Sequence, residues 1–132
     1  MVATASNKGT VLRFFDLENG AKLHEVRRGK DHVSIQDLSF EASLAAKYLT
    51  CTSNKDTIHI FASSNIGSSN QQQEAKNTTS YFSYLSTFVP VLASEWSFAQ
   101  VVMQPRVNEA TVYLTSCVDD VLTIATTDGM VY

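Results

Sequence analysis

The sequence has little that would place it outside the cell or within a membrane. It has only two cysteines among 132 residues, and no apolar run approaches the roughly 18 residues of a membrane-spanning helix. No charged amino-terminal stretch precedes an apolar segment, so no signal peptide is predicted. Because Cys51 and Cys117 fall inside strand-like patterns, we expect a cytosolic protein with free thiols.

Charge is also scarce and is not strongly biased toward one sign. Charged residues make up 17% of the chain and the formal net charge is −3. A nucleic-acid-binding domain normally carries an overall basic face, so we predict no nucleic-acid partner. The 44% share of apolar residues is typical of a soluble folded domain and argues against a disordered chain.

Motifs for catalysis and metal binding are missing as well. The chain has no Gly-x-Ser-x-Gly elbow, and the spacing of His24, His32 and His59 is not typical of a zinc site or a catalytic triad. Adjacent residues such as Asp119 and Asp120 point apart, which favours a connection between two strands over an acid–base pair. We therefore predict that the protein is not an enzyme and uses no cofactor or metal.

Short strands are predicted along most of the chain, with no helix among them. The Asn19-Gly20 and Asp128-Gly129 pairs favour tight type I′ hairpin turns. In residues 57–61, alternation puts Ile58 and Ile60 on one face and the other three residues on the opposite face, which makes a structural role for His59 the simplest interpretation. The predicted strands are residues 2–6, 10–17, 21–27, 34–41, 47–53, 57–62, 96–103, 110–117, 120–126 and 129–132.

Arg27, Arg28 and Gly29 end the third of these strands. Because neighbouring side chains on a strand point to opposite faces, two adjacent arginines can serve two separate anion pockets. Each guanidinium offers a planar fork of donors that suits a phosphate, and the glycine leaves room for oxygens to approach the backbone. The pattern alone also fits solvated edge charges that discourage aggregation.

Residues 63–95 interrupt the strand pattern. Polar low-complexity sequence from Ser63 to Ser80 predicts a long flexible loop. In the segment that follows, residues 81–92, helical spacing predicts an amphipathic segment able to lie in a membrane interface. A buried strand or a loop packed over the core is the alternative, because a basic polar face is lacking and Pro90 limits any helix. The side chains that would insert are Tyr81, Phe82, Tyr84, Leu85 and Phe88.

Several spaced motifs carry a resemblance to one family. Thr4-Ala5-Ser6-Asn7-Lys8-Gly9-Thr10 is followed by Leu12-Arg13-Phe14-Phe15-Asp16 and Glu25-Val26-Arg27-Arg28-Gly29. Ser53-Asn54-Lys55-Asp56-Thr57-Ile58-His59-Ile60-Phe61 looks like a second copy of a Ser-x-Lys-Gly-Thr strand opening, and Ser94-Glu95-Trp96-Ser97-Phe98-Ala99 looks like the segment after a long loop. Over nearly its whole length the chain resembles the PROPPIN family, and within it the human WIPI3- and WIPI4-like branch.

The resemblance implies a fold and a function. PROPPIN proteins are WD-repeat-like, seven-bladed β-propellers that bind phosphatidylinositol 3-phosphate and phosphatidylinositol 3,5-bisphosphate in autophagy and endolysosomal membrane traffic. A blade takes about 40–45 residues. We therefore predict that residues 1–132 form an all-β, partial β-propeller of about three blades, a fragment or truncated paralogue with unpaired blade faces left exposed.

The resemblance also implies two head-group sites and a membrane-inserting loop. Residues 63–95 take the place of the loop that inserts in the family. Asp56 stands where the second motif copy would have glycine, and we expect its carboxylate to oppose a phosphate in the second pocket unless Lys55 neutralises it. The first pocket would use Arg27, Ser6, Lys8 and Thr10, and the second would use Arg28, His32, Ser53, Lys55 and Thr57, with Gly29 leaving room for head-group oxygens.

The expected role is that of a membrane-recruited scaffold supporting autophagosome formation and protein transport. Its partners would be phosphoinositide-containing membranes and, for a full-length molecule, other autophagy proteins. We expect it in the cytoplasm, peripheral on phagophore or preautophagosomal, endosomal, or vacuolar and lysosomal membranes. The alternative is a WD-repeat protein–protein interaction module without lipid binding, because a fold does not fix a function.

Overall fold

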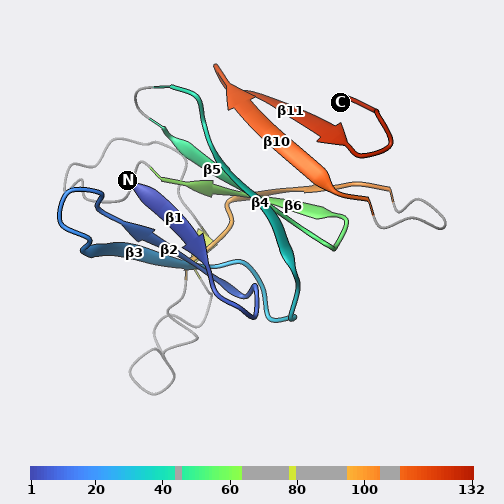
Figure 1. Cartoon of the computed structure of the whole chain (residues 1–132). Coiled ribbons are helices and arrows are strands. Elements are labelled where there is room, and N and C mark those ends of the chain that lie inside the picture. Colours follow the sequence, from blue (N-terminus) through green and yellow to red (C-terminus); the bar gives the residue numbers. More distant parts are fainter. Residues whose placement is uncertain (44–45, 64–77, 80–94, 105–110) are drawn as a thin grey trace.

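Three β-sheets make up the described part of the molecule (Figure 1). The computed structural model describes residues 1–43, 46–63, 78–79, 95–104 and 111–132. Every regular element in these ranges is a strand, which confirms the all-β prediction. No helix among the described residues is long and apolar enough to span a bilayer.

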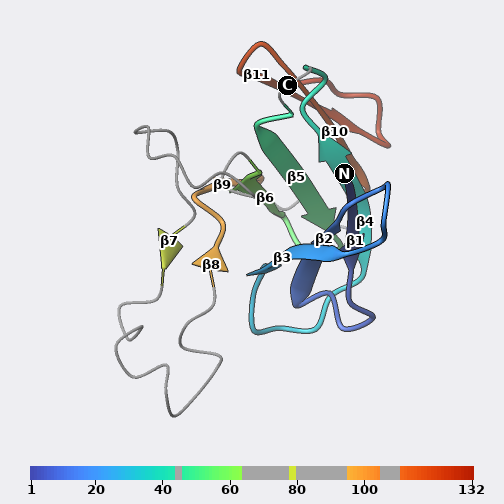
Figure 2. The same cartoon turned by 90° about the vertical axis from the view of Figure 1, so that its left-hand side faces the viewer.

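The first sheet begins as a meander of β1 (Val2–Ala5), β2 (Val11–Phe15) and β3 (Lys22–Arg27). Its order continues through β8 (Glu95–Trp96) to β7 (Thr78–Thr79), two short strands that lie side by side in Figure 2. The β3–β8 pairing is parallel, with Arg27 opposite Trp96. His24 on β3 and Glu95 on β8 reinforce it with a 2.9 Å contact between Nε2 and Oε2.

The second sheet has the order β4 (Ile35–Phe40), β5 (Tyr48–Ser53), β6 (Thr57–Ala62) and β9 (Ala99–Val102). β10 (Tyr113–Val118) and β11 (Val121–Thr126) form the third sheet, a hairpin. β10 lies against β4 and β5. The strand predicted at 96–103 is thus divided between two sheets, and the one predicted at 129–132 is reduced to a single bridge between Ala125 and Val131.

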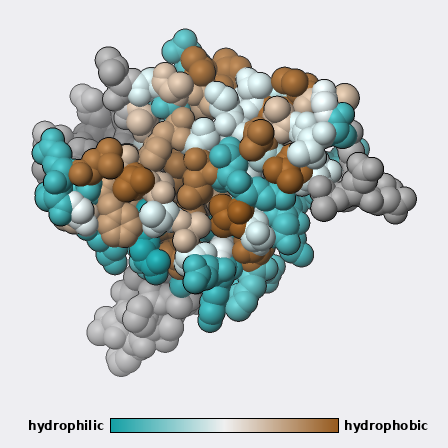
Figure 3. All heavy atoms as spheres, in the orientation of Figure 1, coloured by the Kyte–Doolittle hydropathy of each residue, from teal (hydrophilic) through white to brown (hydrophobic). Residues whose placement is uncertain are grey.

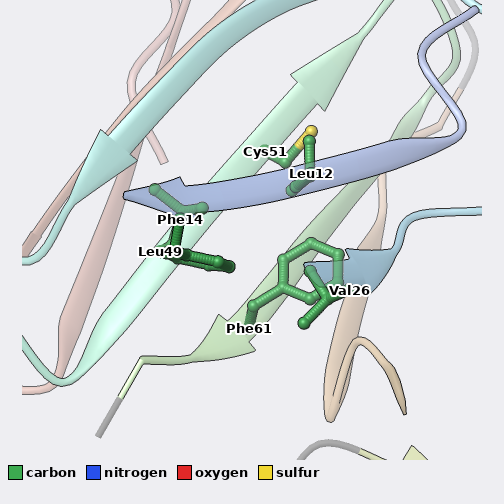
Figure 4. Packing of buried hydrophobic residues seen from close by; sticks show 6 residues of the cluster. All are labelled: Leu12, Phe14, Val26, Leu49, Cys51 and Phe61. Atoms are coloured by element: carbon green, nitrogen blue, oxygen red, sulfur yellow. The ribbon is translucent and has the colours of Figure 1, made fainter. Parts of the chain in front are cut away.

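The main core lies between the first two sheets (Figure 4). Alternate positions on each strand face inward, and burying such side chains stabilises the fold by about 1.5–3 kcal/mol each. A second cluster of Ile58, Tyr113 and Ile124 covers the other face of the second sheet. Both faces of β6 are therefore packed, as its alternation predicts. The six residues of the main core are Leu12, Phe14, Val26, Leu49, Cys51 and Phe61.

The hairpin turns differ from the prediction in where positive φ occurs. At the two predicted type I′ turns only Gly20 and Gly129 have positive φ, so that prediction is wrong. In the first of these turns, Oδ1 of Asp16 accepts a 2.7 Å hydrogen bond from the Glu18 N–H and the carbonyl oxygen of Asp16 accepts one from Gly20, which together build a longer loop.

The two-residue turn with both φ angles positive lies elsewhere, at Asp119 (48°) and Asp120 (63°) between β10 and β11. These residues connect two strands, as predicted.

The β10–β11 hairpin presents apolar side chains to the outside. Figure 3 shows brown, apolar residues over this part of the surface among teal and white ones. An exposed sheet face is what a partial propeller is expected to show. The exposed apolar residues on and next to the hairpin are Leu114, Val118, Val121, Met130, Val131 and Tyr132.

Candidate functional site

Arg27 and Arg28 lie on opposite faces at the end of β3. In the sheet register Arg27 stands opposite Val11 on β2, on the half-buried face that Arg13 shares. Val26, one residue earlier, is buried in the core, and Arg28 extends beyond it on that side with 6% exposure. The two guanidinium groups therefore serve different surroundings, as strand alternation predicts.

Arg28 is held in place by backbone carbonyl groups. Its Nε donates to the Gly9 oxygen at 2.6 Å and its Nη2 donates to the Asp31 oxygen at 2.7 Å. Its own backbone N–H donates to the oxygen of Thr10 at 2.9 Å. Burial lowers the pKa of Arg28 from its usual value, yet a guanidinium stays charged at neutral pH. The remaining N–H groups of this fixed fork can bind an anion.

A first hollow of about 470 Å³ surrounds the turn between β1 and β2. Ser6 organises this turn, because its Oγ accepts hydrogen bonds from the backbone N–H groups of Thr10 and Val11 at 3.3 and 3.2 Å. Arg13 also lines the hollow while its Nε donates to Glu25 at 2.8 Å. The lining residues are Ala5, Ser6, Asn7, Lys8, Thr10, Val11 and Arg13. Three of the four predicted first-pocket residues thus come together, with Arg27 on the same face of the sheet.

A second hollow of about 340 Å³ lies on the other side of the arginine pair, between the first and second sheets. It brings together four predicted residues: Arg28, Gly29, Lys55 and Thr57. A Cβ atom placed on Gly29 would meet no heavy atom within 4 Å, so the backbone is open to a ligand there. Sequence reasoning missed the other five lining residues, which are Lys30, Asp31, His59, Trp96 and Gln100.

The second hollow is electropositive in balance. Arg28, Lys30 and Lys55 face one carboxylate, Asp31, among its lining residues. Asp56 is not part of the lining, and its Oδ1 accepts a 3.1 Å hydrogen bond from the Tyr113 hydroxyl. This hydrogen bond holds the Asp56 carboxylate toward β10. Its opposition to a phosphate in the second hollow stays a prediction.

His59 is both a structural residue and a wall of the second hollow. It is 6% exposed, and its Nδ1 shares a 3.2 Å hydrogen bond with the hydroxyl of Ser97, which also accepts one from Gln100. Burial, and then the charge of Arg28, lower the pKa of His59 to about 4. The ring is therefore neutral at neutral pH, which agrees with the predicted structural role and leaves the hollow's positive charge to Arg28 and the lysines.

Some predicted site residues lie elsewhere. His32 and Ser53 line neither hollow; Ser53 is 1% exposed and its Oγ accepts a 3.3 Å hydrogen bond from the Lys55 N–H. Ser63 is buried and Thr78–Thr79 forms β7, but the five predicted membrane-inserting side chains and segment 81–92 lie outside the described residues. Within the described residues no cluster of three or more metal-ligating side chains occurs.

Relatives of known sequence share the chain's whole length or parts of it. Autophagy-related protein 18 of Caenorhabditis elegans is 33% identical over 147 aligned residues, which cover 100% of this chain and 35% of the worm protein. WD repeat domain phosphoinositide-interacting protein 2 of Gallus gallus is 44% identical over 82 residues, 61% of this chain and 18% of that protein. The chain thus spans about a third, or less, of the length of these relatives. The narrower resemblance to the WIPI3- and WIPI4-like branch stays a prediction.

Solved structures of similar fold also match nearly the whole of this chain and about a third of their own length. Kluyveromyces lactis Hsv2, in a structure with its complete loop 6CD, matches 96% of this chain and 35% of its own with 25% identity and a TM-score of 0.61. Another structure of that protein matches 93% and 33% of the two chains with 23% identity and a TM-score of 0.62. These matches support the propeller-fragment fold. The sequence profile of the PROPPIN family matches residues 1–129, and the chain therefore belongs to the PROPPIN family.

Proposed function

We propose that the chain binds phosphatidylinositol 3-phosphate and phosphatidylinositol 3,5-bisphosphate on membranes, with Arg27 serving the first hollow and Arg28 the second. The observation that carries this proposal is the pair of hollows on either side of two adjacent arginines, each lined by a lysine and a threonine of a Ser-x-Lys-x-Thr turn. Family membership and the name of the Gallus gallus relative support phosphoinositide recognition.

Each hollow offers the chemistry that a phosphate monoester needs. Such a group carries about −1.5 to −2 charges at neutral pH and three strong acceptor oxygens. In the second hollow the fixed fork of Arg28 would bind oxygens directly, with Lys55 and Thr57 as further donors. In the first hollow Lys8 and Thr10 would take these roles, with Arg27 adding its charge. The proposed activity is binding and involves no catalytic step.

Membrane recruitment would come from several weak contacts acting together. Two head-group sites and an inserting loop at residues 63–95 would bind one surface at high effective concentration, which multiplies their affinities. We also propose an autophagy role: the membrane-bound molecule would act as a scaffold on phagophore, endosomal or vacuolar membranes and, when full-length, would recruit other autophagy proteins. The C. elegans relative, an autophagy-related protein by name, supports this assignment.

Flotation with liposomes tests the proposal. We expect the purified chain to float with vesicles that contain phosphatidylinositol 3-phosphate or the 3,5-bisphosphate and to remain unbound with vesicles of phosphatidylcholine alone. Arg27→Thr/Arg28→Thr should abolish flotation. Because Arg28→Thr also removes the hydrogen bonds to Gly9 and Asp31, the milder variants Lys8→Met and Lys55→Met should each weaken flotation with the fold intact by circular dichroism.

Lys47→Met is the matched control, because Lys47 is exposed and lines neither hollow. It removes the same charge and should leave flotation unchanged. Equal flotation with and without the phosphoinositide, or full flotation of the double arginine variant, would overturn the proposal. A folded, monodisperse chain that never floats would favour the protein–protein interaction module instead.

A further inference from the structure

The turn at Lys8, Gly9 and Thr10 touches both hollows at once. The side chains of Lys8 and Thr10 line the first hollow. The carbonyl oxygens of the same three residues all accept hydrogen bonds from the segment that forms the second. Lys8 accepts from the Val33 N–H at 3.1 Å, Gly9 from Nε of Arg28 at 2.6 Å, and Thr10 from the backbone N–H of Arg28 at 2.9 Å.

Gly9 is what allows this close approach. Its φ of 65° is a conformation that side chains with a Cβ rarely adopt. A Cβ at this position would lie 2.3 Å from the Val33 carbonyl oxygen and 2.7 Å from its Cγ2. The turn and the 28–33 segment are therefore packed backbone against backbone.

We propose that the Lys8–Thr10 turn is a positioning element shared by the two hollows, so that a phosphate bound in the first raises the affinity of the second. This inference rests on the proposed function and adds a coupling between its two sites. A phosphate held by Lys8 and Thr10 restricts the turn, and the restricted turn holds the Gly9 carbonyl where Nε of Arg28 needs it. The hydrogen bond that orients the Arg28 guanidinium is strengthened in this way, so the second phosphate loses less entropy on binding.

The coupling is reciprocal by thermodynamic necessity, so a ligand in the second hollow strengthens binding in the first by the same factor. Arg28 provides the link in this direction, because an anion on its remaining N–H groups further restrains the guanidinium that already donates to Gly9. Typical coupling between two sites changes affinity by about 5-fold or more. A change of this size is measurable by titration.

The single tryptophan of the chain gives a reporter for one hollow. Trp96 lines the second hollow and is absent from the lining of the first. Titration with inositol 1,3-bisphosphate, the soluble head group, would be followed by tryptophan fluorescence for the second hollow and by calorimetry for both. The free head group separates site coupling from membrane avidity, because no bilayer is present.

Lys8→Met tests the coupling from the first hollow. The variant removes a phosphate donor and leaves the backbone carbonyls of the turn in place. We expect one site to disappear in calorimetry and the affinity reported by Trp96 to fall about fivefold. Lys8→Arg should restore the calorimetric site and the affinity reported by Trp96. Lys47→Met removes an exposed charge that lines neither hollow and should change neither readout. Lys55→Met should lower first-hollow affinity by a similar factor.

The possible failures point to different causes. If Lys8→Met loses one calorimetric site and the Trp96 titration is unchanged, the coupling is overturned and the two-site function stands. If Lys47→Met weakens the Trp96 titration as much as Lys8→Met does, the effect is one of general charge and the coupling is again overturned. If the unmodified chain shows neither heat nor a fluorescence change, the proposed function fails and the coupling fails with it.

Discussion

Cys51 on β5 and His59 on β6 are direct cross-strand neighbours, and the charge of Arg28 acts on both. Burial raises the pKa of Cys51 to about 12 against the opposing effect of Arg28. Burial and Arg28 together lower the pKa of His59 to about 4. Both neighbours are therefore neutral at neutral pH, which leaves the positive charge of Arg28 uncompensated by them.

The His59 imidazole should make the fold sensitive to acid. Its pKa is about 6.5 when unfolded and about 4 when folded, so the unfolded chain binds the extra proton in this range. Its stabilising contribution is complete above about pH 6.5 and is lost as the pH falls toward 4, by up to roughly 1.4 kcal/mol per pH unit. Urea unfolding at a series of pH values measures the slope. His59→Gln should flatten it, and an equal slope in this variant would contradict the assignment.

The Cys51 thiol should be inert in the folded protein. It is fully buried and its raised pKa leaves almost no thiolate at neutral pH. In a Cys117→Ser background, a thiol reagent should label Cys51 only when urea unfolds the chain, at a rate that follows unfolding. Rapid labelling in native buffer would show that this part of the core opens.

Two glycines with similar φ angles should respond differently to substitution. Gly20→Ala meets no atom within 4 Å and carries only the cost of its φ of 70°, about 1–2 kcal/mol. Gly9→Ala has a similar φ cost and also forces a Cβ against Val33, which adds at least about 1 kcal/mol. Chemical denaturation of the two variants measures the difference. Equal losses would mean that the turn moves away from Val33 without strain.

A glycine in the β10–β11 turn should raise the stability of the chain. Asp120 has a φ of 63°. Glycine adopts this conformation freely, whereas it costs residues with a Cβ about 1 kcal/mol. We expect Asp120→Gly to stabilise the chain by up to about 1 kcal/mol in thermal or urea unfolding. Asp128→Gly is the comparison variant and should destabilise, because Asp128 lacks a positive φ and its Oδ1 accepts a hydrogen bond from the Thr126 hydroxyl. A gain in both variants would contradict the argument.

The two arginines should differ in their contribution to stability. Arg28→Thr leaves the Gly9 and Asp31 carbonyl groups without their guanidinium donors, a loss of about 1–3 kcal/mol when such groups are buried. Arg27 is half-buried on the other face, and Arg27→Thr should cost less. Urea midpoints of the single variants decide this. A larger loss for Arg27→Thr would show that its contacts, and not those of Arg28, hold the end of β3.

Much of the fold is predictable from the sequence because local patterns of apolar and polar residues determine its strands. Period-2 alternation placed the strands within a few residues, and alternation in residues 57–61 foretold that Ile58 and Phe61 face different cores. The types of the hairpin turns were less predictable, because a hydrogen bond from a single side chain to the backbone can favour one turn type over another. Asp16 binds the Glu18 N–H, and this contact favours a longer loop over the type I′ turn that Asn19-Gly20 suggests.

The site was predictable where it follows the motifs and not where it depends on register between distant strands. Lys8, Thr10 and Lys55 line hollows because they lie in hairpin turns, and Thr57 does so because it begins the strand that follows the second turn. Trp96 and Gln100 enter the second hollow only through the pairings of β8 and β9. No local pattern encodes those pairings across residues 63–95. The position of Asp56 was missed for the same reason, because its partner Tyr113 lies 57 residues further along the chain.

The pairing of β3 with β8 also has a consequence for the chain as it is synthesised. His24 and Glu95 are 71 residues apart, so at about 5–20 residues per second the strand that covers the edge of β3 is made roughly 4–14 s later. During that interval the outer edge of the first sheet has unpaired backbone groups able to bind another growing chain. The first sheet therefore keeps an exposed strand edge during synthesis until Glu95 and Trp96 have been made.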